Sequence, residues 1–288
     1  MVRSTDRCYY SSVPRSNGPQ PRAASVDGNR SSSASDDDQA AEGVRSVSRA
    51  LGILALLDDR PDGLSLHEIV ESTGLAKTTV LRLVQTLRQS GLLWVDSRRR
   101  YVPGPGLLRW SHIATRGWEL PAPAREVMRA LADRCGETAI LYVRHELRRV
   151  CVAYEEGTRR LRHIIELGDE YPLWGGAASK VLLLDAPPEL LTRVALASPH
   201  GLDELARLRA QVRETELAGY AESSSELEAG LSSVAVPVRN AAGHVLASLS
   251  LGGPSSRFGT DEIAEMVVAL QAVAADLAGF LPFGAWNA

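Results

Sequence analysis

Residues Ser65–Leu87, with the sequence SLHEIVESTGLAKTTVLRLVQTL, contain the pattern that decides the fold of the N-terminal part of the chain. The pattern predicts two helices joined by a tight turn. Ser65 is a preferred N-cap residue, and Glu68 completes a capping box three positions later. Gly74 is placed to end the first helix, because glycine adopts the left-handed cap conformation without strain.

The second predicted helix starts near Ala76 and has two contrasting faces. Its apolar residues recur at helical spacing and predict a buried stripe; they are Val80, Leu83, Val84 and Leu87. Its other face has several hydrogen-bond donors and no carboxylate, and consists of Lys77, Thr78, Thr79, Arg82, Gln85 and Arg88. Hydroxyl groups at the start of a helix, with Arg and Gln a turn later, suit phosphate and base-edge contacts in a DNA major groove. An ordinary solvated face is the alternative interpretation.

The segments on either side complete a recognisable motif. Residues 44–58, VRSVSRALGILALLD, predict an amphipathic helix. Its expected buried stripe is Val47, Leu51, Leu54 and Leu57, widened by Ala50 and Ile53. Behind the second helix, residues 92–95 and 101–103 predict two short strands around an Arg-rich turn. Three helices followed by such a hairpin predict a winged helix-turn-helix domain over residues 44–105.

The wing gives a second predicted contact with DNA. Its turn contains Arg98, Arg99 and Arg100, which we expect to reach phosphates beside the groove. The predicted DNA-binding set is therefore Ser65, Lys77, Thr78, Thr79, Arg82, Gln85, Arg98, Arg99 and Arg100.

Charge is distributed unevenly along the 288 residues, whose formal net charge is −3. Residues 44–105 hold nine Arg and Lys against six Asp and Glu, a net charge of +3. Residues 106–288 hold eighteen against twenty-three, a net charge of −5. A modestly basic module thus precedes an acidic one, which favours double-stranded DNA as the partner of the first module alone.

Several other classes of protein find no support in the sequence. Cys8, Cys135 and Cys151 form no metal-ligand pattern, and the last two read as core thiols in a reducing cytosol. No apolar run approaches the roughly 18 residues of a membrane span, and the N-terminus lacks the apolar centre of a signal peptide. We therefore expect a cytoplasmic protein with no membrane partner and no cofactor. Residues 1–43, rich in Ser, Arg, Asp, Gly and Pro, predict a disordered tail.

The second half of the chain predicts a larger α+β domain. Residues 106–120 form a predicted linker helix whose Trp110 and Trp118 we expect to pack against another subunit or the second domain. The domain itself covers residues 121–288 and is long enough for a core and a pocket. Its expected strands are residues 139–143, 150–154, 161–167, 219–222, 231–239 and 245–251. After a first helix that ends near Cys135, its expected helices are residues 174–184, 188–197, 202–218 and 261–281.

From Val44 to Leu281 the chain resembles the IclR-type transcriptional regulators. The matching stretches are SVSRALGILALL, GLSLHEIVESTGLAKTTVLRLVQTL, GLL…RRRYVPGPGLL, CGETAILYV, WGGAASKVLLL, GYAESSSELEAGLSSVAVPV and LASLSLGGP. The resemblance implies a winged helix, a linker helix and a C-terminal effector-binding domain with a GAF- or PAS-like antiparallel sheet. It also implies a homodimer or homotetramer that acts as a repressor or activator on partly palindromic operators.

The resemblance implies an effector pocket as well. The corresponding positions here are Trp174, Ala177, Ala178, Ser223, Ser233 and Ser250. Relatives that bind small organic acids often have Asp at the position of Ser223, Cys at that of Ser233 and Ser at that of Gly252. Loss of the Asp acceptor and gain of an aromatic wall at Trp174 favour a different effector, larger or more apolar, although helix N-terminal amides can still hold a carboxylate.

Two alternatives stay open at this point. The C-terminal domain can bind no small molecule and serve oligomerisation or protein partners instead. It can also be an enzyme, since His145, His163, His200 and His244 are available. The second alternative lacks a G-x-S-x-G elbow, an H-E-x-x-H helix, a glycine-rich phosphate loop and a paired-carboxylate motif. A DNA-binding regulator is therefore the expected function, with no catalytic residues.

Overall fold

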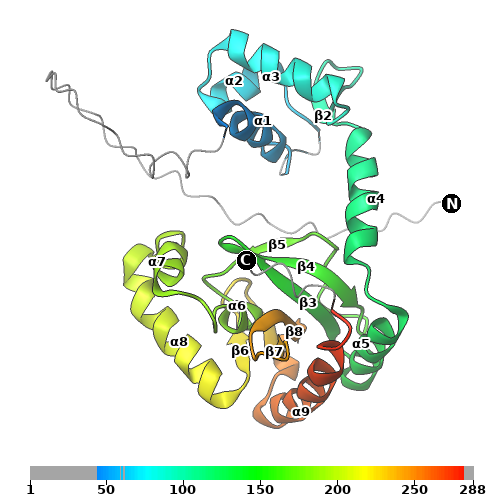
Figure 1. Ribbon diagram of the computed structural model, residues 1–288, viewed down its shortest axis with the longest axis vertical. Helices are drawn as coiled ribbons and strands as arrows, with labels where there is room; N and C mark the ends of the chain where they lie inside the picture. The colour runs from blue at the N-terminus through cyan, green and yellow to red at the C-terminus, as the bar shows by residue number, and fades with distance from the viewer. Residues whose placement is uncertain (1–43, 59, 61, 282–288) are drawn as a thin grey trace, which may run out of the picture. The chain divides into compact units, whose positions relative to one another are not determined.

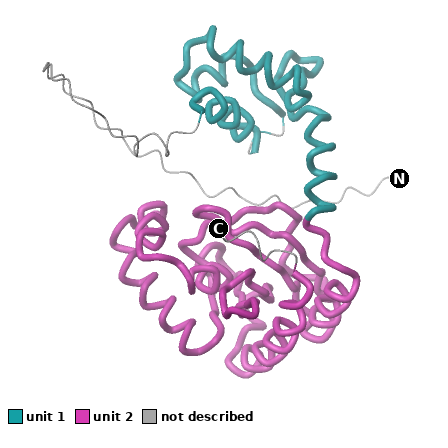
Figure 2. Tube along the Cα trace, in the orientation of Figure 1, with its two compact units in different colours: residues 1–117 teal, residues 118–288 magenta. Residues whose placement is uncertain are grey.

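The computed structural model of the chain describes residues 44–58, 60 and 62–281. The chain divides into two compact units, residues 1–117 and 118–288 (Figure 2). The predicted tail, residues 1–43, lies outside the described residues. We describe each unit by itself.

The first unit has the predicted order of helices and strands (Figure 1). Its elements are α1 (Arg45–Ala55), α2 (Leu66–Thr73), α3 (Lys77–Gln89), β1 (Leu93–Val95), β2 (Tyr101–Pro103) and α4 (Gly106–Trp118). The capping box is present, because Ser65 Oγ accepts the Glu68 N–H at 3.2 Å and Glu68 Oε2 accepts the Ser65 N–H at 2.7 Å. Gly74 closes α2 with a φ of 64°, as the sequence predicted.

The apolar core of the first unit is small and confirms one predicted stripe but not the other. Val80, Val84 and Leu87 of α3 are buried as predicted. On α1, however, Val47 and Leu51 are 54% and 57% exposed. The buried residues of that helix region are Ile53 and Leu57, which face α2 and α3. The apolar face of α1 is wider than a three-helix core can cover, so part of it stays in solvent.

The second unit is built on one six-stranded antiparallel sheet with strand order β5-β4-β3-β8-β7-β6. The strands are β3 (Thr138–His145), β4 (Arg148–Glu155), β5 (Glu170–Pro172), β6 (Ala221–Ser224), β7 (Leu231–Arg239) and β8 (Val245–Pro254). The helices are α5 (Ala122–Cys135), α6 (Ala177–Leu182), α7 (Pro188–Leu196), α8 (Leu205–Ala218) and α9 (Thr260–Leu277), with short 3-10 turns at Gly201–Glu204 and Ser255–Arg257. The predicted α+β class is confirmed.

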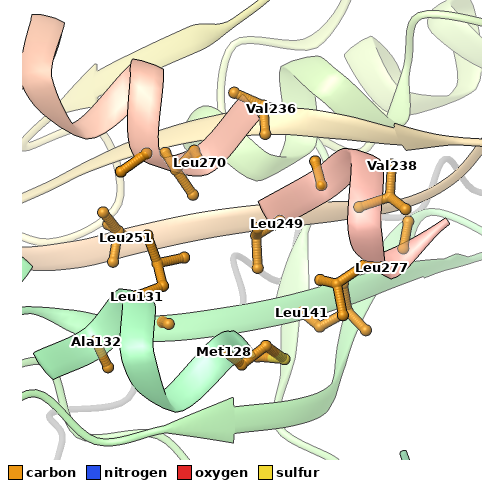
Figure 3. Close-up of a cluster of buried hydrophobic side chains, with 14 of the residues drawn as sticks. Met128, Leu131, Ala132, Leu141, Val236, Val238, Leu249, Leu251, Leu270 and Leu277 are labelled. Carbon is orange, nitrogen blue, oxygen red and sulfur yellow. The ribbon is translucent and has the colours of Figure 1, made fainter. Parts of the chain in front are cut away.

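Helices cover both faces of this sheet (Figure 1). The period-2 alternation of strand side chains divides the core accordingly. Val234, Val236 and Val238 point into a cluster with α5 and α9, while Ala235 joins the cluster with α6, α7 and α8. Figure 3 shows the first cluster, in which Leu131 of α5 and Leu270 of α9 meet Leu249 and other sheet residues.

Two expectations about the second unit were wrong. Residues 161–167 form no strand; the short strand beside β4 is β5, three residues further on. The prediction took the apolar residues of this segment as the buried face of a strand. Leu161, Ile164 and Leu167 are instead more than half exposed. The helix expected over residues 174–184 is confined to Ala177–Leu182, because Gly176, with a φ of 93°, precedes its first turn.

The other element bounds differ from the predicted ones by a few residues. Cys135 is half-buried and Cys151 is buried, and both are free thiols. Burial raises the pKa of Cys151 to about 12, so this thiol stays protonated. None of the helices in the described part of the chain has the length and apolarity that a bilayer crossing requires.

Candidate functional site

The exposed face of α3 gathers most of the predicted DNA-binding residues. Lys77, Thr78, Arg82 and Gln85 are exposed and Thr79 is half-buried, while the opposite side of the helix packs into the core. Within the described part of the chain, Lys77 and Arg82 take part in no ion pair. Among the described residues, no carboxylate therefore competes with DNA phosphates for these two side chains.

The tip of the wing is shaped by Asp96. Its Oδ1 accepts backbone N–H groups from Arg98 at 2.9 Å and from Arg100 at 2.8 Å. Arg99 occupies the tip with a φ of 61°, and both Arg98 and Arg99 are exposed. The Asp96 carboxylate thus accepts hydrogen bonds from the backbone of the turn. The side chains of Arg98 and Arg99 are exposed to solvent.

Arg100 lies differently from what the sequence suggested. Its Nη2 donates to the carbonyl oxygen of Gly63 at 2.7 Å and lies 3.1 Å from Glu68 Oε2 in an ion pair. The pKa of Glu68 is lowered to about 2, first by the backbone N–H of Ser65 and further by the Ser65 hydroxyl and Arg100. Arg100 therefore ties the base of the wing to the start of α2, and the Ser65 hydroxyl is engaged in the helix cap.

A pocket lies in the second unit, on the face of the sheet that α6 covers. Its wall consists of Ile140, Tyr142, Arg149, His163, Gly176, Ala178, Ser223, Leu227, Glu228, Leu231, Ser233, Ser250 and Gly252. The cavity volume is about 30 Å³. One water molecule needs on the order of 10–15 Å³ by this measure, so the cavity has room for two or three waters.

Four of the six predicted effector-binding residues line the pocket. Ala178, Ser223, Ser233 and Ser250 are among its wall residues. Ala177 is fully buried in the core, and Trp174 is half-buried against the same core cluster, so neither reaches the cavity wall. Ala177 is the first residue of α6 and Trp174 lies just before it, and both pack against the core cluster.

The charged wall residue Arg149 was missed by the sequence analysis. Arg149 is 7% exposed, and its Nη1 donates to the carbonyl oxygen of Gly175 at 2.7 Å and to Ser179 Oγ. The guanidinium carbon lies 5.1 Å from the ring centre of Tyr142 and 5.2 Å from that of Tyr171. Strand alternation was the signal that could have found it, because Arg149 shares a face with the buried Cys151.

A largely buried ion pair lies beside the start of α6. Lys180 Nζ lies 2.5 Å from Glu226 Oε1 and donates to the Glu222 carbonyl oxygen at 2.7 Å. Glu226 Oε2 in turn accepts the N–H of Gly176 at 2.8 Å. The carboxylate of Glu226 thus occupies one backbone N–H donor at the start of α6.

His163 is another residue of the pocket wall, and the pKa of its imidazole is strongly shifted. It is 9% exposed, and its carbonyl oxygen accepts the Thr138 hydroxyl at 2.7 Å. Burial, assisted by the nearby Arg149 charge, lowers the pKa of the imidazole to about 4. The ring is therefore neutral at physiological pH.

Comparisons with known proteins agree with this architecture. Residues 46–97 match the IclR helix-turn-helix domain, and residues 112–278 match the family described as bacterial transcriptional regulator IclR C-terminal. The regulator XynR of Escherichia coli is 30% identical over 247 residues, which cover 79% of this chain and 93% of XynR. A crystal structure of an IclR-family regulator from a Rhodococcus species is 40% identical and covers 88% of this chain and 99% of its own, with a TM-score of 0.57.

The fold thus defines a winged-helix DNA-binding regulator with a separate α+β C-terminal domain. The chain belongs to the IclR family of bacterial transcriptional regulators. A further solved structure, that of an IclR homolog from Microbacterium hydrocarbonoxydans, is 20% identical and covers 81% of this chain and 99% of its own, with a TM-score of 0.61. That structure was determined in complex with 4-hydroxybenzoate, and the likeness to it is one of fold.

Proposed function

We propose that this regulator reads an operator with the exposed face of α3 and holds the flanking phosphates with the tip of the wing. The proposed contacts are Lys77, Thr78, Thr79, Arg82, Gln85, Arg98 and Arg99. The observation that carries the proposal is a solvent-exposed helix face that has donors and no carboxylate, next to a hairpin tip with two exposed Arg residues. Ser65 and Arg100 position these elements in our proposal, because both are engaged within the protein.

The proposal assigns different tasks to the helix and the wing. Arg82 and Gln85 lie on the exposed face of α3, in its second and third turns, and they are assigned to sequence reading. Arg98 and Arg99 are assigned to phosphates, which carry no sequence information but fix the register of the protein on the duplex. The two groups therefore have separable effects on specificity and on the salt dependence of binding.

We infer further that the protein binds its operator as a homodimer or a homotetramer. Leu108, Trp110 and Ile113 of α4 are 73%, 53% and 53% exposed. Apolar side chains at this density on one helix are typical of a surface that another chain covers. Two recognition helices brought together in this way read two half-sites about one helical turn apart.

The pocket of the second unit is proposed to bind a small-molecule effector. Ala178, Ser223, Ser233 and Ser250 line a cavity whose wall also holds a buried cation. An effector acts only through different affinities for two arrangements of the dimer. The proposal covers both repression and activation, and it places the protein in the cytoplasm. It includes no catalytic residue, because the named relatives are transcriptional regulators.

An electrophoretic gel-shift with the upstream region of the gene tests the proposal at two stated salt concentrations. We expect sequence-specific retention by the full-length protein, and we expect Arg82→Ala to weaken it by about tenfold or more, the usual cost of one base contact. Arg209→Ala is the matched control, because Arg209 is an exposed residue of α8 in the other unit. Equal retention of a random duplex of the same length would contradict the proposal.

The alternative in which the second unit binds no small molecule makes a different prediction. Operator affinity would then be indifferent to every organic acid tested, and the second unit would affect operator affinity only through its part in assembly. The presence of a cavity lined by four Ser and Ala residues at the expected positions favours the effector hypothesis.

A further inference from the structure

Leu81 is the one apolar residue of α3 that the core of the first unit leaves exposed. Val80, Val84 and Leu87 are buried, and Leu83 packs against the same core cluster. Leu81 belongs to neither group, and its side chain is 42% exposed. The helix therefore presents an apolar side chain on a face that is otherwise polar.

Leu81 lies in a row with three hydrogen-bond donors on the exposed face of α3. Residues four apart on a helix are neighbours, with Cβ atoms about 5–6 Å apart. Lys77 and Gln85 are the neighbours of Leu81 on either side, and Arg88 follows Gln85 after three residues. All four side chains are exposed, and α3 contains no acidic residue. The row therefore combines two positive charges, one amide group and one apolar group.

A single exposed Leu is common on protein surfaces and is not a site by itself. The position of Leu81 decides the matter, because its neighbours Lys77 and Gln85 belong to the set that we assign to DNA. The major groove presents donors and acceptors together with one apolar group at each A·T pair, the C5 methyl group of thymine. The phosphate backbone offers an apolar side chain no such partner.

We propose that Leu81 contacts the C5 methyl group of a thymine in the operator, and that this contact selects thymine over cytosine at one position. The inference rests on the proposed role of α3 in reading the operator. It adds a contact of a different chemical kind. Arg82 and Gln85 contribute hydrogen bonds, whereas Leu81 contributes affinity through burial of apolar surface.

Helix geometry limits where this thymine lies. Leu81 is four residues from Gln85, about 6 Å along the helix axis, and base pairs follow each other about every 3.4 Å. The amide group of Gln suits a bidentate contact with adenine. We therefore expect the thymine within about two base pairs of the pair that Gln85 contacts.

The burial of one methyl group sets the size of the effect. Removal of the thymine methyl group should weaken binding about fourfold, the affinity equivalent of one buried apolar carbon. An operator that a symmetric dimer reads contains the thymine once in each half-site. Its replacement in both half-sites should weaken binding by about tenfold or more, because distant sites contribute additively.

Uracil scanning of the operator tests the proposal, because uracil has the base-pairing groups of thymine and lacks its methyl group. Synthetic duplexes of the upstream region carry uracil in place of one thymine at a time. The full-length protein is titrated with each duplex by fluorescence anisotropy. We expect one such replacement in a half-site to weaken binding about fourfold. The duplexes contain no methylated cytosine, so thymine is their only source of a C5 methyl group.

Leu81→Ala separates a contact by Leu81 from an effect of the methyl group on the shape of the duplex. We expect this variant to bind the unmodified operator about fourfold or more weakly than wild type, and to bind thymine and uracil duplexes equally at the critical position. Its Tm should match that of wild type, because Leu81 lies outside the core cluster. Leu217→Ala, at a residue of α8 that is 89% exposed, is the matched control and should keep the preference for thymine.

The proposal is wrong if no single uracil weakens binding by the wild-type protein, or if Leu81→Ala keeps the wild-type preference for thymine. A smaller mass of Leu81→Ala in light scattering, together with an unchanged preference for thymine, would assign Leu81 to a protein contact and overturn the proposal in that way. Lack of sequence-specific retention of the unmodified duplex would overturn the proposed function, and this inference with it. The two failures are therefore distinguishable.

Discussion

At the scale of single residues, the polar side chains inside the second unit are the most informative part of the molecule. The Glu137 carboxylate is fully buried and forms ion pairs with Arg257 and Arg159. Lys180 forms an ion pair with Glu226. His163 is the contrasting case, because its ring is buried without a hydrogen-bond partner among the described residues. A group that the fold holds at a cost to stability is better explained by binding than by packing.

Protonation of His163 should make the stability of the protein pH-dependent. Its folded pKa of about 4 lies below the ordinary value of 6.5, so the unfolded chain binds more protons between these values. The free energy of unfolding therefore falls as the pH is lowered through this window, by up to about 3 kcal/mol from this group alone. We expect His163→Leu to lose that part of the slope. Urea unfolding from pH 7.5 to 4.5, with His200→Leu as control, measures it; identical slopes in both variants would contradict the prediction.

Arg98 and Arg100 are close neighbours in the wing, but we expect their substitution to affect different properties, DNA affinity for Arg98 and stability for Arg100. Arg100→Met removes hydrogen bonds to the Gly63 carbonyl group and Glu68, and should lower the stability of the first unit by about 1–2 kcal/mol. Arg98→Met touches no such bond, so stability should be unchanged while DNA affinity falls. Hydrogen exchange of the α2 amides measures the first effect and gel-shift measures the second. Unaltered exchange in Arg100→Met would refute the assigned role of Arg100.

At the scale of helices and strands, the sequence predicted elements best where local chemistry determines the backbone. The cap at Ser65 and Glu68 and the stop at Gly74 depend on neighbours only a few residues away, and all three are confirmed. Residues 161–167 show the limit of such signals. Their alternation suits a strand, but the side chains of Thr138 and Arg257 donate to the carbonyl groups of His163 and Leu161, and the segment joins no strand of the sheet.

The pocket residues that lie on strands matched by the family resemblance could be predicted from the sequence. Ser223 and Ser233 are cross-strand partners, and matching two strands in sequence was enough to place both. Arg149 and His163 reach the same cavity from β4 and from a loop, far away in the chain. Their proximity depends on tertiary packing, which neither periodicity nor a local motif encodes.

The recognition helix and the wing should differ in how mutations change DNA binding. Arg82→Ala should reduce affinity for the operator more than for random DNA, because a base contact contributes only where its base is present. Arg98→Ala should weaken both equally and reduce the salt slope of log K by about 1. Fluorescence anisotropy over a salt series measures both effects, with Arg160→Ala, an exposed change in the second unit, as control. The assignment fails if Arg82→Ala lowers both affinities equally.

At the scale of the whole molecule, the two units must communicate for an effector to matter. A coupling free energy between two sites is reciprocal by thermodynamic necessity. If an acid weakens operator binding by some factor, operator DNA must weaken acid binding by the same factor. We expect a factor of about 5–150, the usual range for such coupling. Calorimetry with acetate, glyoxylate and pyruvate, each with and without saturating operator, measures it, and equal affinities would show that the pocket does not regulate DNA binding.

The exposed apolar residues of α4 make assembly the most direct test of the whole arrangement. Trp110→Glu places a charge in the surface that we expect a second chain to cover, one helical turn from Ile113. No α4 residue is buried within the described chain, so the substitution should leave the Tm of the monomer nearly unchanged. Light scattering should then report a smaller assembly than for wild type.

The same variant should also change DNA binding. Loss of simultaneous contact with two half-sites lowers operator affinity by about 10²–10⁴, whereas affinity for an isolated half-site should be preserved. Arg209→Glu, a charge change on the exposed side of α8, serves as the control for net charge. An unchanged mass for Trp110→Glu would move the interface away from α4, and the exposed Val47 and Leu51 of α1 would become the next surface to test.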